Sequence, residues 1–234
     1  MTSQPQTSNN MGKISSKKAV IWDMDGIIVD SARHHLKGWQ MVFRKRGANY
    51  TEEDFRHNTG KRSDTIIKNV LGEKIPQNEI MKIIQEKDET FRQLMGQNIR
   101  PFPGVLKLIA SLKEHKFKIA IASSAPMENI QLITQSLKIH NHFDAIVSGW
   151  EVTRGKPDPQ TFLLAAEKLG VEAERCIVIE DAISGVTASR RAGMPCIAVT
   201  NTTPREELRE ADLIIDTLEE ITADDLERLL NQQK

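Results

Sequence analysis

The sequence has few cysteines, and its charges balance. Only two cysteines occur among 234 residues, Cys176 and Cys196, and each begins a short apolar run. This pattern indicates buried thiols and excludes a disulfide framework. The 32 basic and 32 acidic residues leave no net formal charge, so no long-range field favours nucleic acid or an anionic membrane as a partner. These absences favour a reducing compartment and a small neutral or anionic ligand.

Long apolar segments are also absent from the sequence. No run reaches the roughly 18 apolar residues that a membrane-spanning helix needs, and the first residues lack the apolar centre of a signal peptide. We therefore expect a disordered leader over residues 1–17 and a cytoplasmic protein with no membrane partner. For the oligomeric state, which the sequence does not specify, we expect a monomer or a weak homodimer.

What the sequence does contain is an alternation of β-rich apolar runs with longer amphipathic segments. The apolar runs occur at 19–22, 117–122, 144–148, 176–180, 196–200 and 213–216. Strands that alternate with helices predict a parallel sheet covered on both faces. The expected fold class is therefore α/β, with a doubly wound, Rossmann-like core.

One interval interrupts the alternation. Between about residues 32 and 100 the periodicity is helical, with no convincing strand. This pattern predicts a helical domain inserted after the first strand. We accordingly expect an α-helical cap over residues 32–100 and a catalytic α/β core formed by residues 18–31 and 101–234.

The end of the first strand carries two carboxylates. Ligands of doubly wound sheets bind beyond the carboxyl ends of the strands, and Asp23 and Asp25 stand there, followed by Gly26. Two residues apart on an extended backbone, the aspartates point to the same side. Taken alone, however, the segment is equally explained as a strand that ends in a turn.

The second strand end carries two hydroxyls. Ser123 and Ser124 stand just before a helix that we expect to begin near Pro126. Hydroxyls and free backbone N–H groups at the start of a helix form an anion site. An ordinary serine helix cap is the alternative explanation.

The next two strand ends carry a lysine and two further acids. Lys156 follows Gly155 and is either a fixed positive charge or a solvated lysine. Glu180 and Asp181 continue an apolar strand into a helix, where acids also act as caps. The joint occurrence of these residues at four successive strand ends disfavours an explanation by turns alone.

These residue types together suit phosphoryl transfer. Four carboxylates in one crevice repel one another and need cations or protons, and oxygen ligands favour Mg²⁺ over Zn²⁺. With a proton on Asp25, the remaining carboxylates, one Mg²⁺ and Lys156 would be close to neutral. A phosphate dianion could then approach, and phosphoryl transfer depends mainly on such positioned charge.

The motifs, in this order, resemble those of the haloacid dehalogenase-like hydrolase superfamily, in the branch with a helical cap after the first motif. The resemblance extends from about residue 18 to 231. It implies that Asp23 is the nucleophile, forming an aspartyl-phosphate, and that Asp25 is the general acid and base. It also implies that Mg²⁺ is held by Asp23, the Asp25 carbonyl and Asp181, with Glu180 close by or acting through water.

The same resemblance implies a phosphate-binding group and a set of cap contacts. Ser123, Ser124 and Lys156 would bind the phosphoryl group. The cap resembles those of β-phosphoglucomutase and the sugar-phosphate phosphatases around it, which implies substrate contacts by His35, Trp39 and Gly60. Amphipathic-face and cap-core roles are the alternatives for His35 and Trp39.

The cap also departs from the mutase pattern. Three residues after Gly60, where the mutase has an arginine for a second phosphate, this chain has Ser63. Lys61 or Arg62 could substitute, or both could be solvated charges at a helix start. The departure counts against mutase activity more than against phosphatase activity.

The sequence therefore predicts a Mg²⁺-dependent phosphatase that hydrolyses a small phosphorylated metabolite, a sugar phosphate by expectation, through an aspartyl-phosphate. One alternative is a phosphomutase of the β-phosphoglucomutase type. Another is a non-enzymatic, phosphate-responsive binding module like a receiver domain, although such domains lack the helical insertion. A dehalogenase is disfavoured because that chemistry uses neither Mg²⁺ nor the second acid.

Overall fold

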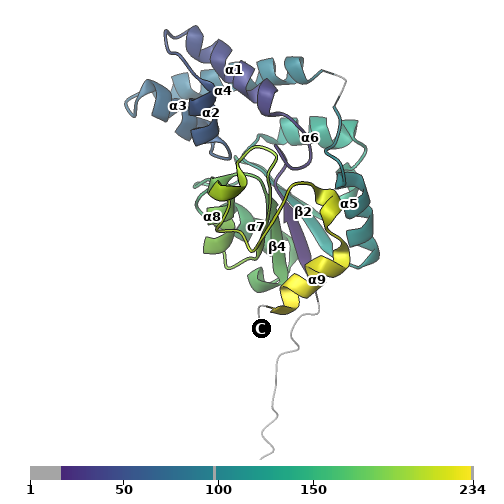
Figure 1. The fold of residues 1–234 in the computed structure, drawn as a ribbon. Helices are drawn as coiled ribbons and strands as arrows, with labels where there is room; N and C mark the ends of the chain where they lie inside the picture. Colours follow the sequence, from purple (N-terminus) through teal and green to yellow (C-terminus); the bar gives the residue numbers. More distant parts are fainter. Residues whose placement is uncertain (1–16, 97–98, 233–234) are drawn as a thin grey trace, which may run out of the picture.

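The structure is a computed structural model that describes residues 17–96 and 99–232. The expected disordered leader, residues 1–17, lies outside the described residues except for its last member. Figure 1 shows a sheet with helices on both sides and a separate group of helices beyond one end of it.

The core contains a six-stranded parallel sheet in the order β3-β2-β1-β4-β5-β6. Its strands are β1 (Ala19–Trp22), β2 (Lys118–Ala122), β3 (Ala145–Val147), β4 (Cys176–Glu180), β5 (Cys196–Val199) and β6 (Leu213–Ile215). Each lies within one residue of a predicted run at either end. The central position of β1, with the chain winding outward on both sides of it, confirms the predicted α/β, doubly wound fold class.

Helices cover both faces of this sheet. They are α5 (Val105–Glu114), α6 (Met127–Ser136), α7 (Gln160–Leu169), α8 (Ile183–Arg191) and α9 (Ala223–Gln232), with short 3₁₀ helices η1 (His140–His142), η2 (Ala173–Arg175), η3 (Arg205–Glu207) and η4 (Leu218–Glu220). Because side chains alternate along a strand, Val20 and Trp22 pack in the cluster with α5, α6 and α9. Ala19 and Ile21 pack on the opposite face, with α7 and α8. Burial on both faces leaves the ends of the strands for polar groups.

Four helices form the group beyond the sheet: α1 (Ala32–Arg44), α2 (Glu52–Asn58), α3 (Ser63–Leu71) and α4 (Gln77–Met95). They enclose an apolar cluster of their own, made of Trp39, Val42, Phe43, Tyr50, Ile66, Ile67, Ile80, Ile83 and Ile84. The apolar stripe of α4 continues to Phe91 and Met95, which pack in the core cluster instead. Helix α4 therefore joins the two parts; the exact domain boundaries at 32 and 100 stay a prediction.

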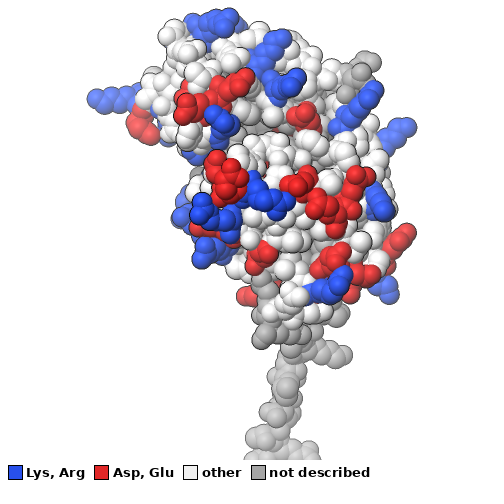
Figure 2. All heavy atoms as spheres, in the orientation of Figure 1, with Lys and Arg blue, Asp and Glu red and all other residues white. Residues whose placement is uncertain are grey.

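The distribution of surface charge and the burial of the two cysteines agree with what the composition predicts. Figure 2 shows basic and acidic side chains interspersed over this face, on the cap and on the core alike. Cys176 and Cys196 are free and buried, as predicted. Within the described ranges, none of the helices combines the length and the apolarity that a membrane span requires.

Candidate active site

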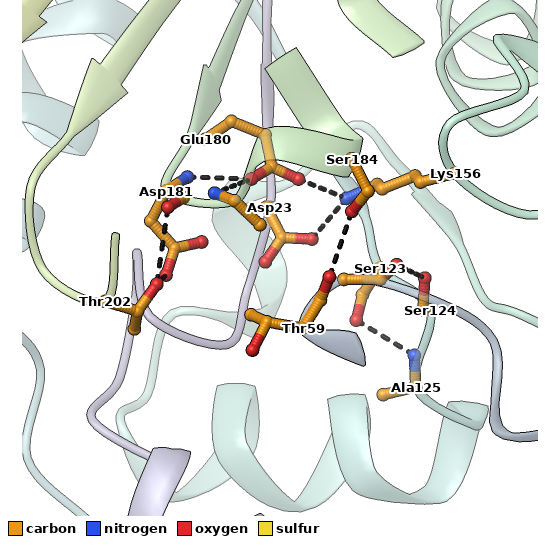
Figure 3. A network of polar contacts seen from close by, with 12 residues as sticks. Asp23, Thr59, Ser123, Ser124, Ala125, Lys156, Glu180, Asp181, Ser184 and Thr202 are labelled. Atoms are coloured by element: carbon orange, nitrogen blue, oxygen red, sulfur yellow. Dashed lines mark hydrogen bonds and ion pairs between the residues drawn. The ribbon is translucent and has the colours of Figure 1, made fainter. Parts of the chain in front are cut away.

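A buried lysine joins the acidic groups at the ends of two neighbouring strands (Figure 3). Because β1 pairs with β4, Asp23 lies beside Glu180 at the carboxyl edge of the sheet. Lys156 Nζ donates to Asp23 Oδ1 at 2.5 Å and to Glu180 Oε1 at 2.7 Å. The lysine side chain is 0% exposed, so it is a fixed charge and not a solvated one.

The two acids at the end of β4 have different partners. Glu180 Oε2 accepts the backbone N–H groups of Asp181 and Ala182, each at 2.7 Å, while its Oε1 is bound by the lysine. The Asp181 carboxylate accepts the hydroxyl of Thr202 through Oδ2. Among the described residues no donor reaches Asp181 Oδ1 or Asp23 Oδ2, so these are the oxygens left for a ligand.

Two glycines make this close packing of carboxylates possible. A Cβ on Gly26, whose φ is +89°, would lie 1.9 Å from Asp181 Oδ2. A Cβ on Gly185 would lie 1.7 Å from Glu180 Oε1. Both distances are far below van der Waals contact, so any side chain at either position displaces a carboxylate of the site.

Asp25 has its partners at the start of the cap. Its Oδ1 accepts the hydroxyl of Ser31 at 2.5 Å and lies 3.0 Å from His35 Nε2. The imidazole is stacked on Phe91 with the ring centroids 4.0 Å apart. Burial and the nearby Lys87 charge lower the pKa of His35, and a neutral imidazole can donate to the Asp25 carboxylate through Nε2.

The charge of the cluster is not balanced by the lysine alone. Burial raises the pKa of Asp23 to about 7, even though Lys156 opposes the shift. Burial, Glu180 and Asp23 raise the pKa of Asp181 well above its ordinary value. For Asp25, burial is outweighed by His35 and Ser31, and the pKa falls. The proton on Asp25 was expected for the site that also holds Mg²⁺, and it stays a prediction.

The hydroxyls after β2 are already engaged. Ser123, which is buried, accepts the backbone N–H of Ala125 at 3.1 Å. Ser124 donates its hydroxyl to the Gly60 carbonyl of the cap at 2.7 Å. No acceptor in the described part of the chain binds the Ser123 hydroxyl proton, so Ser123 can donate it to an anion. The Ser124 proton instead holds the cap in this conformation.

A cavity between the cap and the edge of the sheet brings most of the predicted residues together. The core contributes Asp23, Asp25, Ser123, Ser124, Glu180 and Asp181, and the cap contributes His35, Trp39, Gly60 and Lys61. Two predicted residues do not line it. Lys156 lies behind Asp23, and the Arg62 guanidinium is turned toward the carbonyls of Gly149 and Val152 in the core.

Among the cavity residues that were not predicted as site residues, three bind carboxylates: Ser31, Lys87 and Thr202. Thr202 follows β5, so a search of the fifth strand end would have found it. Ser31 stands at the first turn of α1, where it looks like an ordinary cap. Lys87 continues the apolar stripe of α4 after Ile83 and Ile84, and a lysine at a position on the buried face of a helix indicates a buried charge that needs a partner. It is 4% exposed and bound to the carboxylate of the next residue.

The donor set fits the magnesium ion that the sequence predicts. Within the described ranges, no three His, Cys, Asp or Glu side chains form a complete ligand set. The expected site needs only the carboxylates of Asp23 and Asp181 with the Asp25 carbonyl, and Mg²⁺ usually keeps several waters. Each carboxylate has an unused oxygen. Burial and, after it, the neighbouring carboxylates raise the pKa values of Asp23 and Asp181, and a bound cation would offset both effects by favouring the ionised forms.

A capped, doubly wound α/β core with an Asp-x-Asp pair, a buried lysine and an acidic pair at its carboxyl edge defines a class of aspartate-based hydrolases. The family model described as haloacid dehalogenase-like hydrolase matches residues 20–199. The chain belongs to this family, and the expectation that it is an enzyme of this kind is confirmed.

Individual relatives and solved structures agree with this assignment. The chain is 33% identical to a phosphorylated carbohydrates phosphatase of Thermotoga maritima over 181 residues, covering 76% of this chain and 82% of that one. It is 30% identical to a β-phosphoglucomutase of Bacillus subtilis, covering 88% and 92%. A crystal structure of β-phosphoglucomutase from Clostridium difficile superimposes with a TM-score of 0.85 at 25% identity, covering 93% and 98%.

Proposed function

We propose that the protein is a Mg²⁺-dependent phosphatase for a small phosphorylated metabolite of the sugar-phosphate class. The observation that carries the proposal is the placement of Asp23 in the cavity wall, where buried Lys156 fixes one carboxylate oxygen and no donor among the described residues binds the other. Asp25 lines the same cavity, two residues away. The phosphatase of Thermotoga maritima, named for phosphorylated carbohydrates, supports the choice of substrate class.

In the proposed reaction the two aspartates act in turn. Asp23 Oδ2 attacks phosphorus, the bond from phosphorus to the sugar oxygen breaks, and the leaving oxygen takes a proton from Asp25. The incoming phosphate dianion favours the protonated form of Asp25, because nearby negative charge raises a carboxyl pKa. Water then attacks phosphorus and gives its proton to Asp25, while the bond between Asp23 Oδ2 and phosphorus breaks, which releases inorganic phosphate and restores the Asp23 carboxylate.

The remaining residues of the site offset negative charge and position the reacting groups. Lys156 fixes Asp23 and lies close enough to offset charge on the transferred group, and Ser123 can donate its hydroxyl proton to a phosphoryl oxygen. Asp23, Asp181 and the Asp25 carbonyl would hold Mg²⁺, which supplies positive charge against repulsion between carboxylate and phosphate. The closed cap excludes water from this step.

A phosphomutase is the second candidate, favoured by two lysines in the cavity wall. Lys61 and Lys87 both line the cavity from the cap, where a second phosphate of a sugar bisphosphate would lie. The similarity to a β-phosphoglucomutase of Bacillus subtilis supports the same possibility. Arg62, the third candidate cation, is bound to the core instead.

One experiment decides between the candidates. The purified protein is assayed for phosphate release from a panel of sugar phosphates with Mg²⁺ or with EDTA, beside a mutase assay on β-glucose 1-phosphate with added bisphosphate. We expect Mg²⁺-dependent phosphate release. Conversion that depends on the bisphosphate, without release of phosphate, would support the mutase. No reaction in either assay would refute both proposals.

A further inference from the structure

Arg62 connects the cap to the core loop that carries the catalytic lysine. The residue precedes α3, and its Nη1 donates to the Gly149 carbonyl at 2.7 Å and also to the Val152 carbonyl. Asp64 holds the other edge of the guanidinium, at 3.1 Å from Nε and 3.2 Å from Nη2. The Arg62 side chain is only 13% exposed, so this contact is a buried one between the two parts of the molecule.

The core loop is shaped around this arginine. A Cβ on Gly155 would lie 2.4 Å from Arg62 Cγ and 2.6 Å from its Cδ, and the third-nearest atom is also from Arg62. The guanidinium carbon lies 5.7 Å from the centre of the Trp150 ring, within reach of a cation–π interaction. Lys156 follows Gly155 directly, so the arginine packs on the backbone next to it.

The neighbouring cap residues contact a second core loop and the first turn of α8. The Gly60 carbonyl accepts the Ser124 hydroxyl at 2.7 Å, and the Thr59 carbonyl accepts the Ser184 hydroxyl at 3.0 Å. The short segment 59–62 therefore touches the loops after β2 and β3 and the first turn of α8 (Figure 3 shows two of these contacts). Ser123 and Lys156 reach the site from these two loops, and Asp181 lies just before the start of α8.

We infer that Arg62 is a positioning residue, and not a substrate ligand: by binding the 149–155 loop in the closed state, it holds Lys156 against Asp23 and Glu180. This inference rests on the proposed function for its kinetic consequence. The cap alone supplies the arginine, so the lysine is fully ordered only when the cap closes. Closure thereby completes the site as well as shielding it from water.

Two single variants and their combination test the inference. Arg62→Met removes the contacts to the loop, and Gly155→Ala pushes the arginine out of its place without changing the cap. We expect each to lower kcat about tenfold or more, the usual consequence of misplacing a group that acts in the transition state. The loss should be similar for every phosphate monoester, whatever the charge of its leaving group.

The double variant gives the sharpest expectation. With Arg62→Met already in place, Gly155→Ala should cost little more, because the atoms that the new methyl group meets are those of the arginine. Arg62→Lys should restore part of the activity, since an ammonium can still reach a carbonyl. Arg44→Met, an exposed arginine at the end of α1, is the matched control and should behave as the wild type.

Other outcomes overturn the inference. A rise in KM limited to substrates with a second anionic group, with kcat unchanged, would make Arg62 a substrate ligand. Additive losses in the double variant would also contradict it. If the wild type released no phosphate at all, the proposed function would fail. Small-angle scattering would then test only the contact between Arg62 and the 149–155 loop, because loss of this contact should make Arg62→Met more extended than the wild type. Equal scattering curves would refute the contact.

Discussion

Asp23 and Asp25 are chemically identical and two residues apart, yet their surroundings drive their pKa values in opposite directions. Burial among carboxylates raises the pKa of Asp23 to about 7, while donors on the cap side lower that of Asp25. The proposed roles need the reverse order. A cation beside Asp23 favours its ionised form, and a substrate dianion favours a proton on Asp25, so ligand binding itself sets the catalytic state.

Substitution of the two aspartates should therefore separate their roles. Asp23→Asn should abolish the phosphoenzyme, because an amide cannot attack phosphorus. Asp25→Asn should lower turnover by roughly 10²–10⁴, the usual contribution of a general acid or base. Rapid quenching followed by intact-protein mass spectrometry detects the phosphoryl group. A phosphoenzyme in Asp23→Asn would disprove the nucleophile, and equal melting temperatures would serve as the folding control.

Some of these residue environments follow from the sequence and some do not. Lys156 comes after a strand, and this position predicts that it lies near the carboxyl edge of the sheet, because the carboxyl ends of parallel strands meet at the same edge. The contact of Asp25 with His35 depends on how α1 lies over the sheet, and no local pattern encodes that. Arg62 was expected at the substrate, but the carbonyls that bind it are 87 and 90 residues away in the chain.

At the scale of the elements, the apolar stripe of α4 should determine the stability of the cap. Ile83 is fully buried in the cap cluster. Ile83→Ala removes buried methyl groups and leaves a cavity, so we expect the free energy of unfolding to fall by about 2–5 kcal/mol. Met81→Ala, on the exposed side of the same helix at 45% exposure, should change it by no more than about 0.5 kcal/mol. Urea denaturation followed by circular dichroism compares the two, and similar losses would contradict the assignment of the buried face.

A second element-scale prediction concerns the pH dependence of stability at the β2–β3 edge. Asp144 accepts the backbone N–H of Ile119 at 2.9 Å and the ammonium groups of Lys113 and Lys118 at 3.1 and 2.8 Å. Burial opposes ionisation, but these donors lower the pKa of Asp144 overall. A lowered pKa in the folded state stabilises above the ordinary carboxyl pKa, and the stabilisation is lost as the pH falls through the folded value.

Asp144→Asn should accordingly be less stable than the wild type at neutral pH, and the difference should shrink below about pH 4, the ordinary range of an aspartate. Urea unfolding of both proteins at a series of pH values measures the difference in unfolding free energy. A difference that stays constant with pH would show that the charge of Asp144 contributes nothing.

The sequence predicted the strands better than the relation between the elements. Apolar runs such as Cys176–Glu180 are easily delimited, because a charged residue stands on either side of the run, Arg175 before it and Asp181 after it. The helices of the cap were also expected. Their placement over the sheet was not, since it depends on contacts such as Ser184 with Thr59, which join residues 125 apart.

For the whole molecule, the closed cap raises the question of how substrate enters. Asp23 is only 6% exposed, and Asn129 of α6 binds both Arg92 and Asp88 of α4, at 2.9 and 3.2 Å. The two connections between cap and core lie side by side, since Phe102 N–H donates to the Ile28 carbonyl at 3.0 Å. Two paired connections form a natural hinge, which predicts that the cap opens as a unit.

Small-angle scattering tests this opening. Without ligands the protein should sample open conformations and have a larger radius of gyration than it has with Mg²⁺ and a phosphate-mimicking metal fluoride, which should favour the closed state through contacts from both parts. Asp23→Asn, which lacks the carboxylate for the mimic, should not respond and is the matched control. Identical curves with and without the mimic would mean that the cap does not open measurably, and substrate would then have to enter the cavity with the Asn129 contacts intact.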